Sequence, residues 1–380
     1  MLKGNKGEWS ELYVFAKLLA EGKLYQSDIE LKRDDNFYEI TKAYREDAIS
    51  VLEYQRDEQI VIFRKEENSS ELLRVLPKEY FTNSAIIILD GIIKGTGKSF
   101  EIPQASEFIS LNGINKLTAL TTSKSDIKLR IYDHRLARET DLGFSIKSLL
   151  GQDSTLLNTG PGNNFIYNII GSKIADIDEF NIRTYKPAGK ISKLTARLSE
   201  ILTDGASISF KEIQSKQLWL NLKMIDGDLP QILAFALTYR WIYRQNSLKE
   251  ICSILEEKDP MNFYNGINTT QMLYEYKLKK FLAECAMGMT SETPWEGIYD
   301  ATGGVIIVKE DGDIVCFHVY DFNLFRDYLL NNTIFEQPST GEDGNNPGHE
   351  RAIGKKYYYG WLYREGDDLQ YKINLQIRFK

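Results

Sequence analysis

The chain has 380 residues, of which 42% are hydrophobic and 27% are charged, so it can bury a large core and is typical of a soluble globular protein of one to three domains. Its formal net charge of −7 argues against a protein that coats nucleic acid through bulk positive charge, so any DNA contact must come from a local basic surface. The three cysteines are widely spaced, which predicts reduced structural thiols in a cytoplasmic protein. No apolar run is long enough for a membrane span, and the charged first residues are unlike a signal peptide, so we expect no membrane association.

The first predicted element is a helix over residues 7–19. Its apolar stripe consists of Leu12, Phe15, Leu18 and Leu19. At about 100° per residue, Glu8 and Glu11 fall inside the same stripe. Carboxylates that face a core are costly unless they are paired or bind a metal ion, so both are candidate metal ligands. The alternative is that they are first-turn charges that interact favourably with the helix dipole.

Strands are predicted over residues 37–41 and 50–65, and helices over residues 83–95 and 105–110. None of these four segments carries side chains that converge on one chemistry.

A β-hairpin follows between residues 126 and 147. Its two runs alternate apolar and polar residues, and the apolar positions are Ile127, Leu129, Ile131, Leu142, Phe144 and Ile146. A turn centred near Leu136 would place Asp126 opposite Ile146. Ser145 and Lys147 share the other face of the second strand, so the acid would lie beside them. The hairpin would therefore bring together an acid, a small polar group and an amine.

This arrangement resembles the PD-(D/E)XK nuclease motif, in which an aspartate at the end of one strand lies beside an acid-x-lysine tripeptide on the next. Here Asp126 is followed after eighteen residues by Ser145-Ile146-Lys147. Phosphodiester hydrolysis needs a hard cation that neutralises negative charge and acidifies a water, and oxygen ligands hold Mg²⁺. The resemblance implies that Asp126 and the backbone carbonyl of Ile146 bind Mg²⁺ and that Lys147 orients the nucleophile.

The sequence departs from the motif at two positions. Ser125 stands where the motif has proline, and Ser145 stands where it has aspartate or glutamate, which removes one metal-binding carboxylate. Glu11, or Glu8, would supply the missing negative charge. We therefore predict Asp126, Lys147, Ser145 and Glu11 as the catalytic residues. A serine hydrolase built on Ser145 and Lys147 is disfavoured because no nucleophile elbow surrounds Ser145.

Two loops are candidates for DNA contact. The first is the turn-rich segment 155–165, whose amide side chains are Asn158, Asn163 and Asn164; turn chemistry alone is the alternative. The second is the polar loop 337–351, which is followed by a predicted strand over residues 355–363. Side chains that can donate to bases there are Gln337, Arg351, Lys355 and Lys356. A disordered surface loop is the alternative for the second segment.

Three separated segments of the chain resemble the HpaII family of type II restriction endonucleases. They are Gly4–Tyr13, Gly143–Ser148 together with Thr155–Asn158, and Leu375–Phe379. The resemblance implies a Mg²⁺-dependent endonuclease that cuts double-stranded DNA, and by analogy a CCGG target. A palindromic target would call for a homodimer. Such an enzyme also requires a cognate DNA methyltransferase in its host.

The expected fold is α/β, with a PD-(D/E)XK core of mixed β-sheet flanked by helices, a helical insertion and a β-rich C-terminal segment. We predict a nuclease core over residues 1–185, a helical subdomain over residues 186–300 and a β-rich, target-reading segment over residues 301–380. The alternative function is a DNA-binding module with a degenerate site. In that module Asp126 and Lys147 would form an ordinary cross-strand ion pair.

Overall fold

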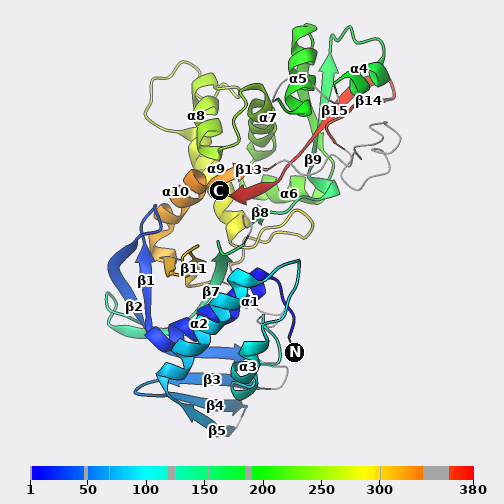
Figure 1. Ribbon diagram of the computed structural model, residues 1–380. Helices are drawn as coiled ribbons and strands as arrows, with labels where there is room; N and C mark the ends of the chain where they lie inside the picture. Colours follow the sequence, from blue (N-terminus) through cyan, green and yellow to red (C-terminus); the bar gives the residue numbers. More distant parts are fainter. Residues whose placement is uncertain are drawn as a thin grey trace. The chain divides into compact units, whose positions relative to one another are not determined.

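The computed structural model describes residues 2–46, 50–67, 69–118, 125–151, 155–184, 191–299, 301–336 and 359–380. The chain divides into two compact units, each assembled from two stretches of sequence. The first unit comprises Met1–Ser154 and Ile298–Tyr328, and the second comprises Thr155–Gly297 and Leu329–Lys380. Figure 1 shows the elements of each unit. These boundaries differ from the three consecutive segments predicted, because strands near residue 310 return to the sheet of the first unit.

The first unit is built on a nine-stranded mixed sheet in the order β1-β12-β11-β7-β6-β2-β3-β4-β5. Its strands are β1 (Lys23–Ser27), β2 (Arg33–Glu46), β3 (Val51–Arg56), β4 (Ile60–Glu66), β5 (Ser69–Leu76), β6 (Ile127–Asp133), β7 (Arg138–Ser148), β11 (Gly304–Val308) and β12 (Ile314–His318). The β1–β12 and β11–β7 pairs are parallel, and the other neighbours are antiparallel. The fold is therefore α/β with a mixed sheet, as predicted.

Strand β1 also pairs with β2, so β1, β12, β11, β7, β6 and β2 form a closed ring of hydrogen-bonded neighbours. The length of β2 makes this possible: its first part pairs with β1 up to Glu39, and its last part pairs with β3 from Lys42 onward. Closure removes two exposed sheet edges, which would otherwise present unpaired backbone groups.

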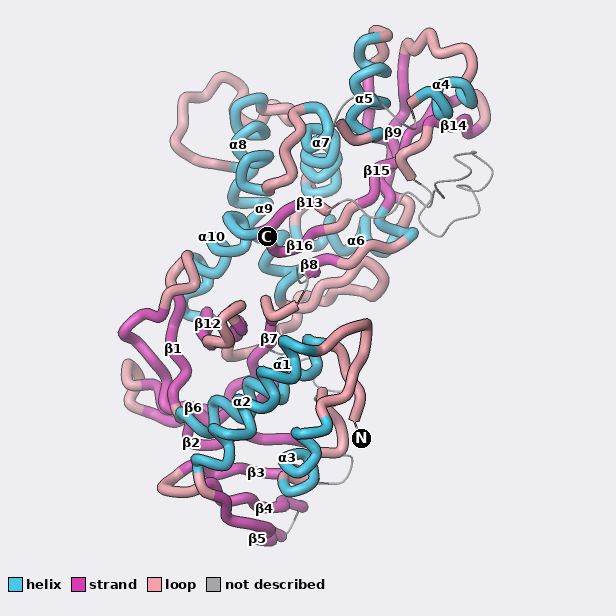
Figure 2. Tube along the Cα trace, in the orientation of Figure 1, coloured by secondary structure: helices cyan, strands magenta, loops and turns pink. Residues whose placement is uncertain are grey.

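The helices of the first unit are α1 (Lys6–Glu21), α2 (Lys78–Lys94), η1 (Pro103–Ala105) and α3 (Ser106–Leu111), and η3 (Val319–Asp321) leads into α10 (Phe322–Asn332), whose last residues belong to the second unit. Helix α1 packs against β2 and β7 of the sheet. Helix α1 begins at a capping box formed by Asn5 and Glu8, and it ends at Gly22, whose φ of 73° favours glycine. Helices α1 and α2 pack side by side (Figure 2).

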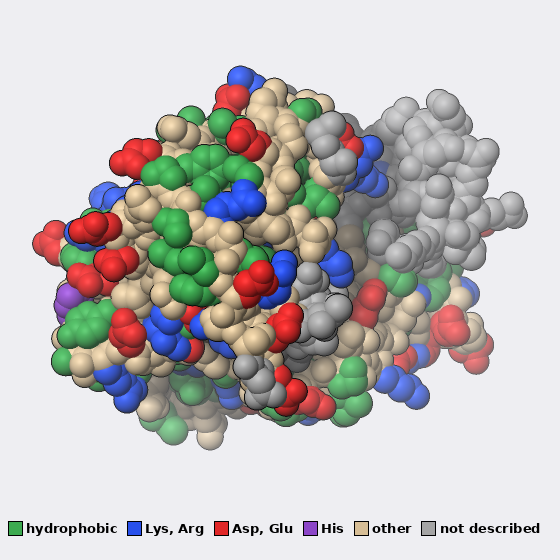
Figure 3. Space-filling model, turned by 90° about the horizontal axis from the view of Figure 1, so that it is seen from below, with side chains coloured by type: hydrophobic (Ala, Val, Ile, Leu, Met, Phe, Trp, Pro, Cys, Tyr) green, Lys and Arg blue, Asp and Glu red, His purple; other side chains and the backbone are tan. Residues whose placement is uncertain are grey.

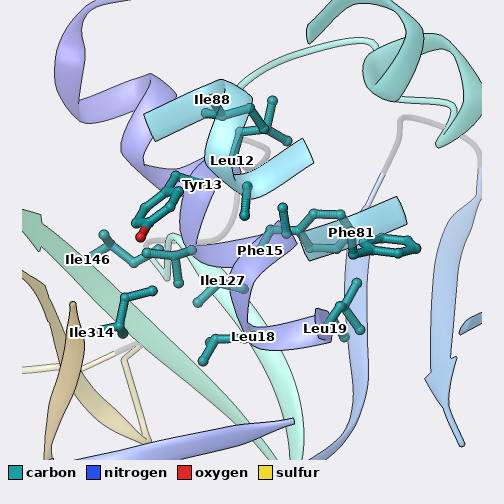
Figure 4. Packing of buried hydrophobic residues seen from close by; sticks show 14 of the residues in the cluster. Leu12, Tyr13, Phe15, Leu18, Leu19, Phe81, Ile88, Ile127, Ile146 and Ile314 are labelled. Carbon is teal, nitrogen blue, oxygen red and sulfur yellow. The ribbon is translucent and has the colours of Figure 1, made fainter. Parts of the chain in front are cut away.

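The core between these helices and the sheet contains the apolar stripe predicted for the first helix. Leu12, Phe15, Leu18 and Leu19 are buried to 1% exposure or less. Figure 4 shows them beside Phe81 and Ile88 of α2 and beside Ile127 and Ile146 of the hairpin strands. Burial of this stripe fixes the rotation of α1 about its axis, and hence the direction in which Glu8 and Glu11 lie.

The second unit has two antiparallel sheets and six α-helices among its described residues. One sheet has the order β10-β9-β15-β14 and the other β13-β16-β8. The strands are β8 (Thr155–Leu157), β9 (Asn164–Ile170), β10 (Ser207–Ile213), β13 (Thr333–Phe335), β14 (Leu362–Glu365), β15 (Asp368–Asn374) and β16 (Ile377–Phe379). The helices are η2 (Pro161–Asn163), α4 (Ile177–Arg183), α5 (Lys193–Thr203), α6 (Lys216–Ile225), α7 (Leu229–Ile242), α8 (Leu248–Lys258) and α9 (Leu273–Ala286). The predicted helical segment is therefore one layer of a mixed unit, because its helices pack on strands that precede and follow it in sequence.

Across the described residues, no helix combines the length and the apolar composition that a membrane crossing requires.

Candidate active site

The predicted hairpin is present, with a register one residue different from the prediction. Ile127 lies opposite Phe144 and Asp133 lies opposite Arg138, so extension of the ladder places Asp126 opposite Ser145 rather than Ile146. The connecting turn is centred half a residue earlier than predicted, and that offset shifts every pairing by one position. The shift also changes the face of Asp126, because directly opposite residues share a face: the predicted register would place it with Ile146, and the observed register places it with Ser145 and Lys147.

The carboxylate of Asp126 is held by the neighbouring strand. Its backbone N–H donates to the carbonyl of Phe144 at 2.9 Å, which continues the ladder beyond the end of β6. Its Oδ2 accepts from Ser145 Oγ at 3.1 Å and from the N–H of Ile146 at 2.6 Å. No described residue donates to Oδ1, so this oxygen is available as a ligand. Ser145 thus fixes the orientation of the carboxylate instead of supplying a second one.

Lys147 lies half-buried on β7, two residues beyond Ser145. On the other edge of β7, the parallel strand β11 places the fully buried Ile307 opposite Lys147. Within the described part of the chain, the Lys147 ammonium makes no hydrogen bond and no ion pair within 4.0 Å. The cross-strand ion pair with Asp126, which the binding-module hypothesis expects, is therefore absent.

Glu11 shares a cavity with Asp126. The cavity has a volume of about 40 Å³, enough for a single ion or one or two waters. Its lining residues are Glu11, Phe15, Tyr44, Arg45, Glu46, Thr118, Ser125, Asp126, Ile127 and Lys128. Glu11 of α1 and Asp126 at the end of β6 thus line one small cavity.

Arg45 is a member of this site that the sequence analysis missed. Its guanidinium donates to the carbonyl oxygens of Lys116 at 2.7 Å and Leu117 at 3.1 Å. Burial lowers the pKa of Arg45, and the nearby Tyr54 and Glu11 act in the opposite direction. The sequence contains a signal for this position. Arg45 lies two residues after the fully buried Ala43 on β2, so both side chains point to the same, inner face of the strand.

Glu8 has a different role from Glu11. Its Oε2 accepts from the N–H of Asn5 at 2.7 Å, and its own N–H donates to Asn5 Oδ1 at 3.0 Å. This is the reciprocal capping box, which satisfies two backbone donors at the start of α1. Glu8 does not line the cavity that holds Glu11 and Asp126. Of the two glutamates, the structure therefore favours Glu11 for the site.

The predicted DNA-contacting residues fall into three groups. Asn158 is exposed beyond the end of β8. Asn163 and Asn164 are at most 1% exposed, and their amides bind partners inside the second unit, including the carbonyls of Leu375 and Pro161. Their burial and internal hydrogen bonds give both side chains a structural role in the second unit. Gln337, Arg351, Lys355 and Lys356 lie outside the described residues.

Carboxylate oxygens that could bind a metal ion are available in the cavity that Glu11 and Asp126 line. Among the described residues, no group of three or more His, Cys, Asp or Glu side chains is placed to hold a metal ion. Magnesium is usually bound through one or two carboxylates, with waters and substrate phosphate completing its shell. Asp126 and Glu11 in one cavity provide that number of carboxylates.

Comparison with known proteins gives one consistent result. The family model described as HpaII restriction endonuclease matches residues 5–379. The type II restriction enzyme HpaII of Haemophilus parainfluenzae is 32% identical over 380 residues, which cover 99% of this chain and 98% of that protein. No solved structure matches. Because both matches span essentially the whole chain, the protein belongs to the HpaII family of restriction endonucleases.

Proposed function

We propose that this protein is a Mg²⁺-dependent endonuclease that cleaves both strands of DNA at a specific sequence. Family membership supports the reaction class. The observation that carries the proposal is the placement of Asp126, Ser145 and Lys147 on one face of the β6–β7 hairpin, with an ammonium that no described residue neutralises.

Asp126 Oδ1 and the Glu11 carboxylate would hold the metal ion, together with the backbone carbonyl of Ile146. Bound Mg²⁺ supplies charge neutralisation and lowers the pKa of water. Ser145 keeps the Asp126 carboxylate in one orientation through its 3.1 Å hydrogen bond. The Lys147 ammonium would lie beside the reacting phosphate, where it orients the attacking water and stabilises the added negative charge. Hydrolysis of a phosphate ester can require on the order of 20 kcal/mol of barrier reduction, which positioning and charge stabilisation must supply.

For the target we propose CCGG, on the basis of the family resemblance. A palindrome has two-fold symmetry, so we propose a homodimer in which each copy cuts one strand. The enzyme would act in the cytoplasm beside a methyltransferase that protects the same sequence in host DNA. Figure 3 shows acidic and basic side chains interspersed over the face that it views, so DNA binding there would depend on local groups instead of a broad positive field.

The experiment compares two plasmids that differ only in a single CCGG site. We expect Mg²⁺ to support linearisation of the plasmid with the site, and we expect EDTA, or alteration of the site, to prevent it. Ser145 in place of a carboxylate is the observation that favours the alternative, a DNA-binding module without catalysis. That alternative predicts plasmid that is retarded in a gel and remains intact at every Mg²⁺ concentration.

A further inference from the structure

The second unit contains a cavity of about 370 Å³ between the start of α5 and the end of α7. Its lining residues are Ile191, Ser192, Thr195, Arg240, Trp241, Arg244, Gln245 and Asn246. Two guanidinium groups, two hydroxyls and two amides line it, and none of the described lining residues is acidic. A cavity of this size falls within the range of roughly 300–1,000 Å³ that is typical of ligand pockets.

Arg240 brings a buried positive charge to this cavity. Its residue exposure is 8%, and its guanidinium stacks on the ring of Trp241 at 4.3 Å. Among the described residues its side chain makes one hydrogen bond, from Nη1 to the backbone carbonyl of Glu336 at 2.7 Å. A buried cation is costly unless an anion or several acceptors satisfy it. The charge of Glu336 acts on Arg240, and the N–H groups of Arg240 other than Nη1 have no acceptor among the described residues, so they are available to a ligand that accepts hydrogen bonds.

The charge of Arg240 is maintained at neutral pH. Burial lowers its pKa to about 10, while the charge of Glu336 and the phenol of Tyr359 oppose that shift.

Arg244 supplies a second guanidinium from a strained position. It has a φ of 56°, which a glycine adopts without strain and an arginine does not. The residue follows the end of α7, where glycine is the usual choice. Its side chain is exposed and binds no described residue.

The start of α5 adds neutral donors to the same cavity. Ser192 is the N-cap of α5, and its hydroxyl accepts from the N–H of Thr195 at 3.1 Å. The first N–H groups of a helix carry partial positive charge and bind phosphate readily. Together with the two arginines, they form a surface suited to a tetrahedral anion.

We propose that this cavity binds a backbone phosphate of the DNA, with Arg240 and Arg244 as its charged donors. The inference rests on the proposed function, because DNA is the substrate that it assumes. Contacts of this kind position a protein on the duplex without reading its sequence. The cavity would thus hold the second unit on the DNA while other groups select the target.

Arg244→Gly tests the proposal without threatening the fold, because glycine suits a φ of 56°. Binding of a fluorescent duplex that contains CCGG would be measured by anisotropy in EDTA over a range of salt concentrations. We expect the Kd of Arg244→Gly to rise roughly tenfold, and the slope of log K against log salt to fall by about one. Lys223→Ala is the matched control, because it removes an exposed positive charge of the same unit that does not line the cavity.

The possible results separate three explanations. Unchanged affinity and unchanged salt slope in Arg244→Gly would overturn the phosphate assignment while the proposed function stands. In a second possible result, inorganic phosphate raises the unfolding temperature of the parent but not of Arg244→Gly, and the two chains bind the duplex equally. That result also overturns the assignment, because the cavity is then a site for free phosphate and not for DNA. A parent chain that neither binds nor cuts the duplex contradicts the proposed function itself.

Discussion

The substitution Lys147→Met separates a catalytic lysine from a structural one. Methionine keeps most of the length and apolar surface of the side chain and removes the ammonium. Because that ammonium has no hydrogen bond or ion pair with any described residue, we expect the free energy of unfolding to change by no more than about 0.5 kcal/mol. Removal of a single group that stabilises transition-state charge typically lowers the rate by roughly 10²–10³-fold, or about 2.7–4 kcal/mol.

The assay is single-turnover cleavage of a plasmid with one CCGG site, with DNA affinity measured separately without Mg²⁺. Lys147→Met should bind with parental affinity and cut at least a hundredfold more slowly. Arg138→Met is the control, because Arg138 is an exposed cation at the other end of β7 that binds no described side chain. Cleavage by Lys147→Met at the parental rate would refute the catalytic assignment. A loss of stability above about 2 kcal/mol would show that the lysine is structural.

Three further predictions concern the acids and a buried histidine. Glu11→Gln should lower the cleavage rate by at least tenfold, whereas the cleavage rate of Glu8→Gln should stay within a few-fold of the parental rate. Equal losses of rate in the two variants would contradict the assignment of Glu11 to the site. MgCl₂ should raise the unfolding temperature of the parent and not that of Asp126→Asn, and an equal shift in both would place the metal elsewhere. Burial, with the positive charge of Arg135, lowers the pKa of His318 to about 4. The unfolded chain then binds more protons than the folded chain between about pH 4 and pH 6.5, so stability falls as the pH falls through that window. Between pH 7.5 and pH 5 the free energy of unfolding, measured with urea, should fall by about 2 kcal/mol less in His318→Gln than in the parent. An equal fall in both chains would contradict the lowered pKa of His318.

The local pattern of the sequence was sufficient for the hairpin and for the first helix. Alternation of apolar residues depends only on the two-residue period of a strand, so the two strands of the hairpin and the shared face of Ser145 and Lys147 were predicted correctly. Their register was not, because register depends on the geometry of the turn, which Ala137 with a φ of 48° helps to define. The stripe that contains Glu11 was also predicted correctly, since helix periodicity and burial determine it together.

The domain organisation could not be predicted from local patterns. Strands β11 and β12 have the expected hairpin signal, but nothing in their own sequence specifies that β11 pairs with β7 or that β12 pairs with β1. Such pairings join residues far apart in the chain and are determined by tertiary packing. The roles of Asn163 and Asn164 were missed for the same reason, because their buried partners lie on segments that come together only in the folded unit.

The most direct measurement is a digest of DNA of known sequence, with the ends of the fragments read by sequencing. With Mg²⁺ present, every end should map to the same position within a CCGG site, and Asp126→Asn should produce no fragments under the same conditions. Ends scattered over the sequence would contradict a site-specific enzyme. Fragments from Asp126→Asn identical to those of the parent would show that the acid at the end of β6 is not part of the catalytic centre.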